Sequence, residues 1–311
     1  MTLGEPLGVF SATDPGRIGA ESLFRLRVAG AEVNVAIALA RLGVPAWFLG
    51  AVGADAVGAA VRRVLRAEGV DTRYLVEEDG PTGLMLKEWY GLRPEPRIYY
   101  FRRETAIQRW DPPRDVWANE AIRRAHFTGI TLMLAPALAE RVTAWVEAGH
   151  AAGMAFSLDI NYRRRLGPPE AWRPRVEGLL PFLDVLFASR DELAVLWGTT
   201  DPGEMQARGL LSARQVVVVT DGAQGAWAVQ NGEEIARVAA FSVPRVVDVV
   251  GAGDGFVGGV LAGRMKGWDW RESLRLGALV GAFAVAHPGD WEGYPLWSEV
   301  EAQLQGQWVD R

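Results

Sequence analysis

The chain has 311 residues, of which 49% are hydrophobic and 23% are charged, and its formal net charge is −5 at pH 7. This length is sufficient for one large buried core, and the slightly acidic charge offers no basic face for nucleic acid. The absence of cysteine excludes disulfides and thiolate metal sites. The first residues do not resemble a signal peptide, and no apolar run approaches the roughly 18 residues of a membrane helix. We therefore expect a cytoplasmic protein with no membrane or nucleic-acid partner.

The chain reaches Gly4-Glu5-Pro6 after three residues, where an α/β protein usually opens with an apolar strand. Either the start is late or the first strand is short. Apolar residues at helical spacing, each run followed by glycine, predict helices over 31–43 and 55–69. Short apolar runs predict buried strands at 45–53, 125–130, 155–161, 184–189 and 215–222.

Strands separated by helices indicate parallel βαβ units, which together form a doubly wound, mostly parallel sheet flanked by helices. Two segments, 22–28 and 82–104, instead alternate polar and apolar residues, and the second contains a turn-forming Gly-Leu-Arg-Pro-Glu-Pro. A period of two predicts half-exposed antiparallel strands, which we interpret as a small inserted β-lid. The predicted main domain comprises 1–8, 30–80 and 109–311, and the lid comprises 9–29 and 81–108.

The lid is rich in aromatic residues. They could pack against the lid itself, line a substrate pocket or form a dimer contact, and the sequence does not choose among these alternatives. The residues are Trp89, Tyr90, Tyr99, Tyr100 and Phe101.

The segment VPRVVDVVGAGDGFVGGVLAG (243–263) is the strongest candidate for a ligand site. Its β-branched run predicts a strand that ends at Asp248, and the small apolar residues after the glycines predict a helix. Such a turn can be a simple tight connection. In a doubly wound sheet, however, ligands bind beyond the carboxyl ends of the strands, where glycine and a helix N-terminus let an anion approach backbone N–H groups.

Of two familiar nucleotide-binding motifs, the P-loop is excluded and the dinucleotide fingerprint does not fit its context. The two lysines, Lys87 and Lys266, precede Glu and Gly, so the chain has no Gly-Lys-Ser/Thr of a P-loop. The glycines from 253 to 258 match a dinucleotide fingerprint, but the next element is predicted to be another helix (272–286) rather than a strand ending in an acid. The three histidines are scattered, which argues against zinc hydrolysis.

An anion site that contains a carboxylate suits phosphoryl transfer to a hydroxyl group. The N–H groups of Gly251 to Gly253 would stabilise charge on the transferring group, and Asp254 would accept the hydroxyl proton.

Two motifs resemble those of the ribokinase-like (PfkB-type) carbohydrate kinases. DVVGAGDGF resembles the family's carboxy-terminal signature, Asp-Thr-x-Gly-Ala-Gly-Asp, and AGAEVNVAIALARLG (29–43) resembles its amino-terminal signature. The resemblance extends over essentially the whole chain, including the lid. Within the family, the early Gly-Glu-Pro, Glu32 and the segments 98–103, 159–166 and 289–295 are most similar to the 2-keto-3-deoxygluconate kinases.

The resemblance implies an ATP- and Mg²⁺-dependent kinase for a small acid sugar, with Asp254 as the base and Gly251, Ala252 and Gly253 as the anion hole. It also implies that Glu192 holds Mg²⁺ through a water molecule. The implied sugar contacts are Gly30, Asn34, Tyr100, Arg102 and Arg163, and the implied nucleotide contacts are Ser189, Thr220, Gly222, Gly225 and Gly253. The two arginines suit a carboxylate because guanidinium binds it bidentately.

Each of these assignments has a simpler alternative: Asn34 as a helix cap, the arginines as surface residues, and 220–225 as a hairpin turn. Val249 replaces the family's usual threonine, which leaves the need for a monovalent cation open. Ser189 and Trp89 likewise replace the more common Asn and Tyr.

Three other functions remain to be distinguished from an acid-sugar kinase. They are a kinase for a neutral ketose or for 5-dehydro-2-deoxygluconate, a non-catalytic sugar-binding relative and a nucleotide-linked dehydrogenase. The expected partners are the sugar, ATP and further copies of the chain, bound through the lid.

Overall fold

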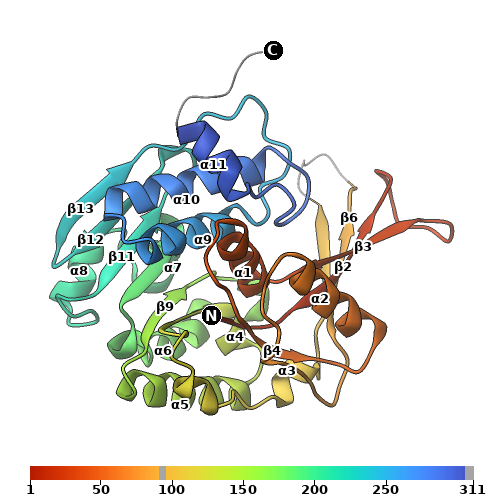
Figure 1. Ribbon diagram of the computed structural model, residues 1–311, viewed down its shortest axis with the longest axis horizontal. Coiled ribbons are helices and arrows are strands. Elements are labelled where there is room, and N and C mark those ends of the chain that lie inside the picture. The colour runs from red at the N-terminus through yellow and green to blue at the C-terminus, as the bar shows by residue number, and fades with distance from the viewer. Residues whose placement is uncertain (91–95, 305–311) are drawn as a thin grey trace.

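The computed structural model describes residues 1–90 and 96–304 and is built around a nine-stranded sheet (Figure 1). The strand order is β13-β12-β11-β10-β9-β8-β1-β4-β5. Neighbouring strands are parallel except for the pairs β11–β12 and β12–β13. The strands are β1 (Thr2–Leu3), β4 (Phe48–Val52), β5 (Leu75–Glu77), β8 (Arg124–Thr128), β9 (Ala155–Asp159), β10 (Val185–Ser189), β11 (Val216–Thr220), β12 (Ala226–Gln230) and β13 (Glu233–Val238).

The first strand, β1, is short. It has two residues and lies in the middle of the sheet, between β4 and β8. The amino group of Met1 donates to the carbonyl of Arg124 at 2.8 Å, and burial lowers the pKa of that amino group to about 5. The amino group of Met1 is therefore buried inside the core.

Helices cover both faces of the sheet, which confirms the predicted doubly wound α/β fold. One apolar cluster lies between the sheet and α1, α2, α9, α10 and α11, and the other lies on the opposite face, under α3 to α8. The α-helices are α1 (Ala31–Arg41), α2 (Ala56–Ala67), α3 (Ala106–Arg109), α4 (Gly129–Met133), α5 (Pro136–Ala151), α6 (Pro169–Glu177), α7 (Arg190–Trp197), α8 (Pro202–Ala207), α9 (Ala252–Met265), α10 (Trp270–Val285) and α11 (Trp297–Leu304). The 3₁₀ turns are η1 (Asp115–Ala118), η2 (Arg164–Leu166), η3 (Leu180–Phe182) and η4 (Gly222–Gln224).

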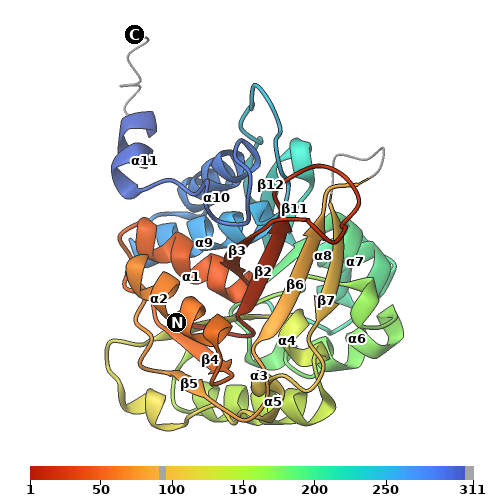
Figure 2. The same ribbon diagram turned by 90° about the vertical axis from the view of Figure 1, so that its right-hand side faces the viewer.

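A second sheet of four strands stands beside the main sheet and forms the lid (Figure 2). Its order is β3-β2-β6-β7, in which β2 and β6 are parallel and the two outer pairs are antiparallel. The strands are β2 (Leu7–Ala12), β3 (Phe24–Ala29), β6 (Gly83–Glu88) and β7 (Arg97–Phe101). The turn predicted at 91–96 lies, except for Pro96, outside the described residues.

The predicted strand before the glycine-rich turn is wrong. Residues 243–250 form no strand, and Val246 is 58% exposed. The segment follows β13 and has no partner strand in the described residues, and one strong backbone bond ties Val247 to Val285 at 2.7 Å. Because β-propensity depends on a neighbouring strand and on burial, the β-branched residues alone did not produce a strand here.

In the part of the chain that the structure describes, no helix has both the length and the apolar character required to cross a membrane.

Candidate active site

One cavity of about 2490 Å³ lies between the lid and the carboxyl ends of the central strands. Asp159, Ser189 and Thr220, the last residues of β9, β10 and β11, line it from the main sheet. Met85 and Tyr100 line it from the lid. The cavity therefore occupies the position where ligands bind in doubly wound sheets.

The N-terminus of α9 points its first turn into this cavity. Gly251 is the N-cap and has φ 78°, and a Cβ atom there would lie 1.8 Å from the carbonyl oxygen of Asp290. Only glycine fits this position. Gly253 faces open space and, like Gly251 and Asp254, lines the cavity, whereas Ala252 is not among the lining residues. The N–H of Ala252 makes only a long bond of 3.4 Å to the carbonyl of Val249. The N–H groups of the first helical turn and the helix dipole make this a suitable cradle for an anion.

Asp254 lies in the first turn of α9 and is held by two amide side chains. Its carboxylate accepts hydrogen bonds from Nδ2 of Asn34 at 2.7 Å and from Nδ2 of Asn161 at 3.1 Å. Burial raises the pKa of Asp254 to about 7, while Asn34 and the positive charge of Arg163 oppose the rise. A carboxylate with this pKa can accept a proton near neutral pH far better than an ordinary aspartate can.

Asn161 is a site residue that the sequence analysis did not single out. It lies two residues after β9 in the left-handed region, with φ 47°, and also donates to Asp159 at 3.0 Å. The side-chain oxygens of Asn34 and Asn161 are buried and have no hydrogen-bond partner within the described residues. The signal that could have revealed Asn161 is a polar Asp-x-Asn immediately after a buried strand, at the ligand-binding edge of the sheet.

Asp159 and Glu192 add further carboxylates to the cavity. The pKa of Asp159 is raised well above its usual value by burial and by the charges of Glu192 and Asp254. Glu192 accepts from the backbone N–H groups of Tyr162 at 2.6 Å and Ser189 at 2.7 Å. Ser189 in turn caps α7 by accepting from Glu192 N at 3.2 Å. Glu192 and Ser189 thus stabilise the start of α7 in addition to lining the cavity.

These carboxylates suit a divalent cation whose other ligands would be nucleotide phosphates rather than protein side chains. Among the described residues, no three His, Cys, Asp or Glu side chains are grouped to hold a metal ion by themselves. The charge of Glu192 nevertheless helps to raise the pKa of Asp159, and an Mg²⁺ ion carried by nucleotide phosphates would offset this unfavourable charge.

A monovalent cation fits less well. Asp248 already accepts from the N–H groups of Val250 at 3.0 Å and Gly289 at 3.4 Å, and the exposed side chain of Val249 has no oxygen.

The predicted sugar contacts line the cavity both from the lid and from the main domain. Gly30 has φ 134° and lies against the backbone of Glu5, where a Cβ atom would be 2.4 Å from an oxygen. Tyr100 projects from β7, and the guanidinium of Arg102 lies 5.2 Å from the centre of its ring. Arg102 is already paired with Glu5, to which its Nε donates at 2.7 Å.

Arg163 differs from Arg102 because it is exposed in the cavity. In the described residues no carboxylate lies within ion-pair distance of it, and its Nη1 donates to the carbonyl of Tyr162 at 3.2 Å. Arg163 therefore presents a free positive charge beside Asp254.

Of the predicted nucleotide contacts, Ser189, Thr220 and Gly253 line the cavity, whereas Gly222 and Gly225 are not among its lining residues. Thr220 ends β11 and lines the cavity, and Gly222 and Gly225 shape the turn between β11 and β12. Gly225 has φ 99°, and a Cβ atom would lie 2.1 Å from the carbonyl oxygen of Val238. The close approach of β13 thus explains this glycine, and a hairpin role for the turn stays compatible with a nucleotide contact.

A carboxylate at a glycine-rich helix start, placed beneath a β-lid at the edge of a doubly wound sheet, fits the class of phosphotransferases that act on small hydroxyl compounds. Residues 7–296 match the pfkB family of carbohydrate kinases. The chain belongs to this family and is an ATP-binding sugar kinase.

Curated relatives and solved structures agree with this assignment. The chain is 31% identical to the 2-dehydro-3-deoxygluconokinases of Bacillus subtilis (strain 168) and Thermoproteus tenax, with 99% and 98% of this chain and 95% and 94% of those proteins covered. The crystal structure of a putative ribokinase II from E. coli in complex with ATP and Mg²⁺ has a TM-score of 0.86 at 26% identity and covers 98% of both chains. A fructokinase from Xylella fastidiosa with bound ATP gives a TM-score of 0.84 at 26% identity, covering 98% of both chains.

Proposed function

We propose that the protein phosphorylates a primary hydroxyl of a small acid sugar, converting 2-keto-3-deoxygluconate to its 6-phosphate with ATP. The observation that carries this proposal is the pairing, in one cavity, of a base poised near neutral pH with a free guanidinium. Asp254 suits the transfer, and Arg163 suits the carboxylate of the substrate. The names of the two relatives above and of a 2-dehydro-3-deoxygalactonokinase from Haloferax volcanii, 30% identical, support the same substrate class.

In the proposed reaction the sugar hydroxyl lies between Asp254 and the γ-phosphorus. The O–H bond breaks as Asp254 accepts the proton, a new O–P bond forms, and the bond to the leaving ADP breaks. Gly251 to Gly253 direct backbone N–H groups at the phosphoryl oxygens, where negative charge must be stabilised. Asn34 and Asn161 hold the carboxylate in place, and their unpartnered oxygens can accept hydrogen bonds from sugar hydroxyls.

The other predicted sugar contacts keep the roles that the family resemblance implies, except that Arg102 is only partly available to the substrate. Gly30 and Tyr100 border the sugar, and Arg163 pairs with its carboxylate. Because Glu5 already occupies two nitrogens of Arg102, only the remaining edge of that guanidinium is available to the substrate.

On the nucleotide side, Ser189, Thr220, Gly222, Gly225 and Gly253 are the proposed ATP contacts. Mg²⁺, when bound with ATP, neutralises phosphate charge, and Glu192 is proposed to hold it through a water molecule. Dependence on ATP supports our expectation of a cytoplasmic location.

The first prediction concerns substrate choice and is tested by measuring ATP consumption across a panel of sugars. We expect the highest kcat/KM with 2-keto-3-deoxygluconate or its galactonate epimer, and much lower values with fructose, because a neutral sugar gains nothing from Arg163. A preference for fructose or for 5-dehydro-2-deoxygluconate would contradict the proposed substrate and leave the assignment as a sugar kinase in place. No ATP consumption with any sugar would favour a non-catalytic sugar-binding protein.

The second prediction concerns assembly through the lid. The outer face of the lid is apolar: Phe10 pairs with Leu26 and Leu86, and Leu86 pairs with Tyr99. Leu26 is 44% exposed, and Tyr99 and Phe101, which also border the cavity, are 43% and 61% exposed. We propose that this face binds the same face of a second copy, because a two-fold interface joins identical patches.

Sedimentation of a Leu26→Asp, Phe101→Asp variant should then show a shift from dimer to monomer. The matched control is Val195→Asp, which places the same charge on an exposed apolar position of α7, away from the lid, and should stay dimeric. A parent protein that sediments as a monomer at micromolar concentration would contradict the lid interface.

A further inference from the structure

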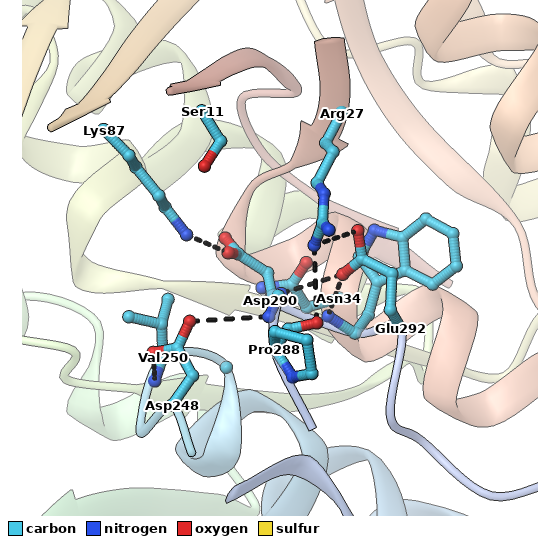
Figure 3. Close-up of polar contacts among 12 residues, drawn as sticks. Ser11, Arg27, Asn34, Lys87, Asp248, Val250, Pro288, Asp290 and Glu292 are labelled. Atoms are coloured by element: carbon cyan, nitrogen blue, oxygen red, sulfur yellow. Dashed lines mark hydrogen bonds and ion pairs between the residues drawn. The ribbon is translucent and has the colours of Figure 1, made fainter. Parts of the chain in front are cut away.

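Lys87 is a buried lysine on the inner face of the lid, and it forms an ion pair with Asp290 (Figure 3). The side chains are only 4% and 9% exposed. Lys87 projects from β6, whereas Asp290 belongs to the loop between α10 and α11 and lines the cavity. The pair therefore joins a strand of the lid to the wall of the active site.

The loop that carries Asp290 packs against the N-terminus of α9. The contact between the carbonyl of Asp290 and Gly251 is so close that no side chain fits between them. Gly289 N donates to Asp248 at 3.4 Å, and the hydroxyl of Tyr294 donates to the carbonyl of Gly251 at 2.5 Å. A shift of this loop must therefore move the turn that presents N–H groups to the cavity.

The lid also contacts this loop through a second ion pair, which is more exposed. Arg27 of β3 lies 3.1 Å from Glu292 and donates to the carbonyl of Pro288 at 3.3 Å (Figure 3). The side chains of Arg27 and Glu292 are 28% and 30% exposed, and a partly exposed pair contributes little because water screens it. Loss of one partner of a buried pair, in contrast, leaves an uncompensated charge in the interior. Of the two pairs, Lys87–Asp290 is the one whose loss should displace the loop.

We propose that Lys87 is a positioning residue for phosphoryl transfer. By pairing with Asp290, it couples the seating of the lid over the sugar to the placement of Gly251 and the first turn of α9. The proposal rests on the proposed roles of that turn and of Asp254, but it does not depend on which sugar is phosphorylated.

The charges around the pair provide a second readout. Burial raises the pKa of Asp290, and Lys87 opposes this rise. The charge of Asp290 in turn raises the pKa of Asp254. The other charged groups that face Asp290 are Asp248 and Asp254 near the start of α9, Glu292 on its own loop and Arg27 on β3. Removing the ammonium takes away the cation that lowers the pKa of Asp290, so Asp290 needs a higher pH to ionise. Once Asp290 is ionised, its unbalanced negative charge raises the pKa of Asp254 further.

The test compares Lys87→Met with Arg27→Met, which removes the exposed cation that the lid directs at the same loop. We expect Lys87→Met to lower kcat by at least about 10-fold, to move the acid limb of the kcat profile to higher pH, and to change the KM for ATP by less than about threefold. Arg27→Met should keep kcat within about threefold and leave the pH profile unchanged. Lys87→Arg, which retains a cation at this position, should have the same pH profile as the parent.

Equal kcat values and equal pH profiles for Lys87→Met and Arg27→Met would overturn the proposal. If Lys87→Met does not fold, a Lys87→Met, Asp290→Asn variant removes the buried unpaired charge, and its kcat should still be at least about 10-fold below that of the parent. Parent-like kcat in that double variant would also overturn it. All variants are assayed with the sugar for which the parent protein has the highest kcat/KM. If the proposed substrate is wrong, the sugar panel of the parent shows it, and the comparison between variants stays valid.

Discussion

Replacement of Asp254 by Asn is expected to lower kcat by about 100-fold or more, the usual scale for loss of a general base. Asparagine has nearly the same shape as aspartate but cannot take the proton of the sugar hydroxyl. Nucleotide binding, measured by titration calorimetry, should stay close to that of the parent because the N–H groups of Gly251 to Gly253 are retained. Turnover within a few-fold of the parent would remove Asp254 from the role of base.

The same carboxylate sets the expected pH dependence. Its folded-state pKa is about 7, against 3.8 without burial, so kcat/KM of the parent should rise with pH through about 7 as Asp254 ionises. The raised pKa also means that the folded state binds a proton more tightly than the unfolded state, and stability falls as pH rises through this range. At pH 8, Asp254→Asn should therefore unfold at a higher temperature than the parent.

Asp269→Asn is the matched control for this variant. Asp269 caps α10 and is exposed, and asparagine caps a helix about as well as aspartate does. Its kcat and pH profile should equal those of the parent. A similar kcat loss in both variants would show that the assay reports a general effect of removing acids rather than the chemistry at α9.

The elements that follow from local patterns were predictable from the sequence. Helical periodicity followed by glycine located α1 and α2 to within about two residues, and short apolar runs located the parallel strands β4, β8, β9, β10 and β11. Alternation with a period of two located β3, β6 and β7 of the lid. These patterns succeed because each is set by which face of the element is buried.

The strand predicted before Asp248 failed because it depended on a partner that the chain does not supply. Nothing in 243–248 reveals that β13 is the last strand of the main sheet. Likewise, the predicted strand at 155–161 extends past the true end of β9 at Asp159, because Asn161 has left the extended conformation.

The position of Asp254 could be predicted because its glycine-rich turn is local, but its partners could not. Asn34 and Asn161 reach it from segments 220 and 93 residues away in the chain. The Lys87–Asp290 pair spans 203 residues, and the Glu5–Arg102 pair spans 97. Single residues of common types carry no signal of such distant pairing, so Arg102 was expected to be free for the substrate and is instead engaged by Glu5.

The contrast between the two arginines leads to the last prediction, a test of the acid sugar. Arg163→Ala should raise the KM for 2-keto-3-deoxygluconate by about 10- to 150-fold, because a charge-assisted pair contributes about 1.5–3 kcal/mol. The KM for ATP should barely change. Since the charge of Arg163 lowers the pKa of Asp254, the acid limb of kcat/KM should also move to higher pH.

Arg102→Ala provides the comparison, because its main expected effect is on stability. It leaves the buried carboxylate of Glu5 without its cation, which costs about 3–5 kcal/mol for a buried pair, and the unfolding temperature should fall. Arg163 is exposed and bears no ion pair within the described residues, so Arg163→Ala should unfold like the parent while losing affinity for the acid sugar. Fructose, if it is accepted, should lose little with Arg163→Ala, since it has no carboxylate to pair. Equal losses on fructose and on the acid sugar would instead assign Arg163 to the shape of the pocket, and the proposed recognition of a carboxylate would fail.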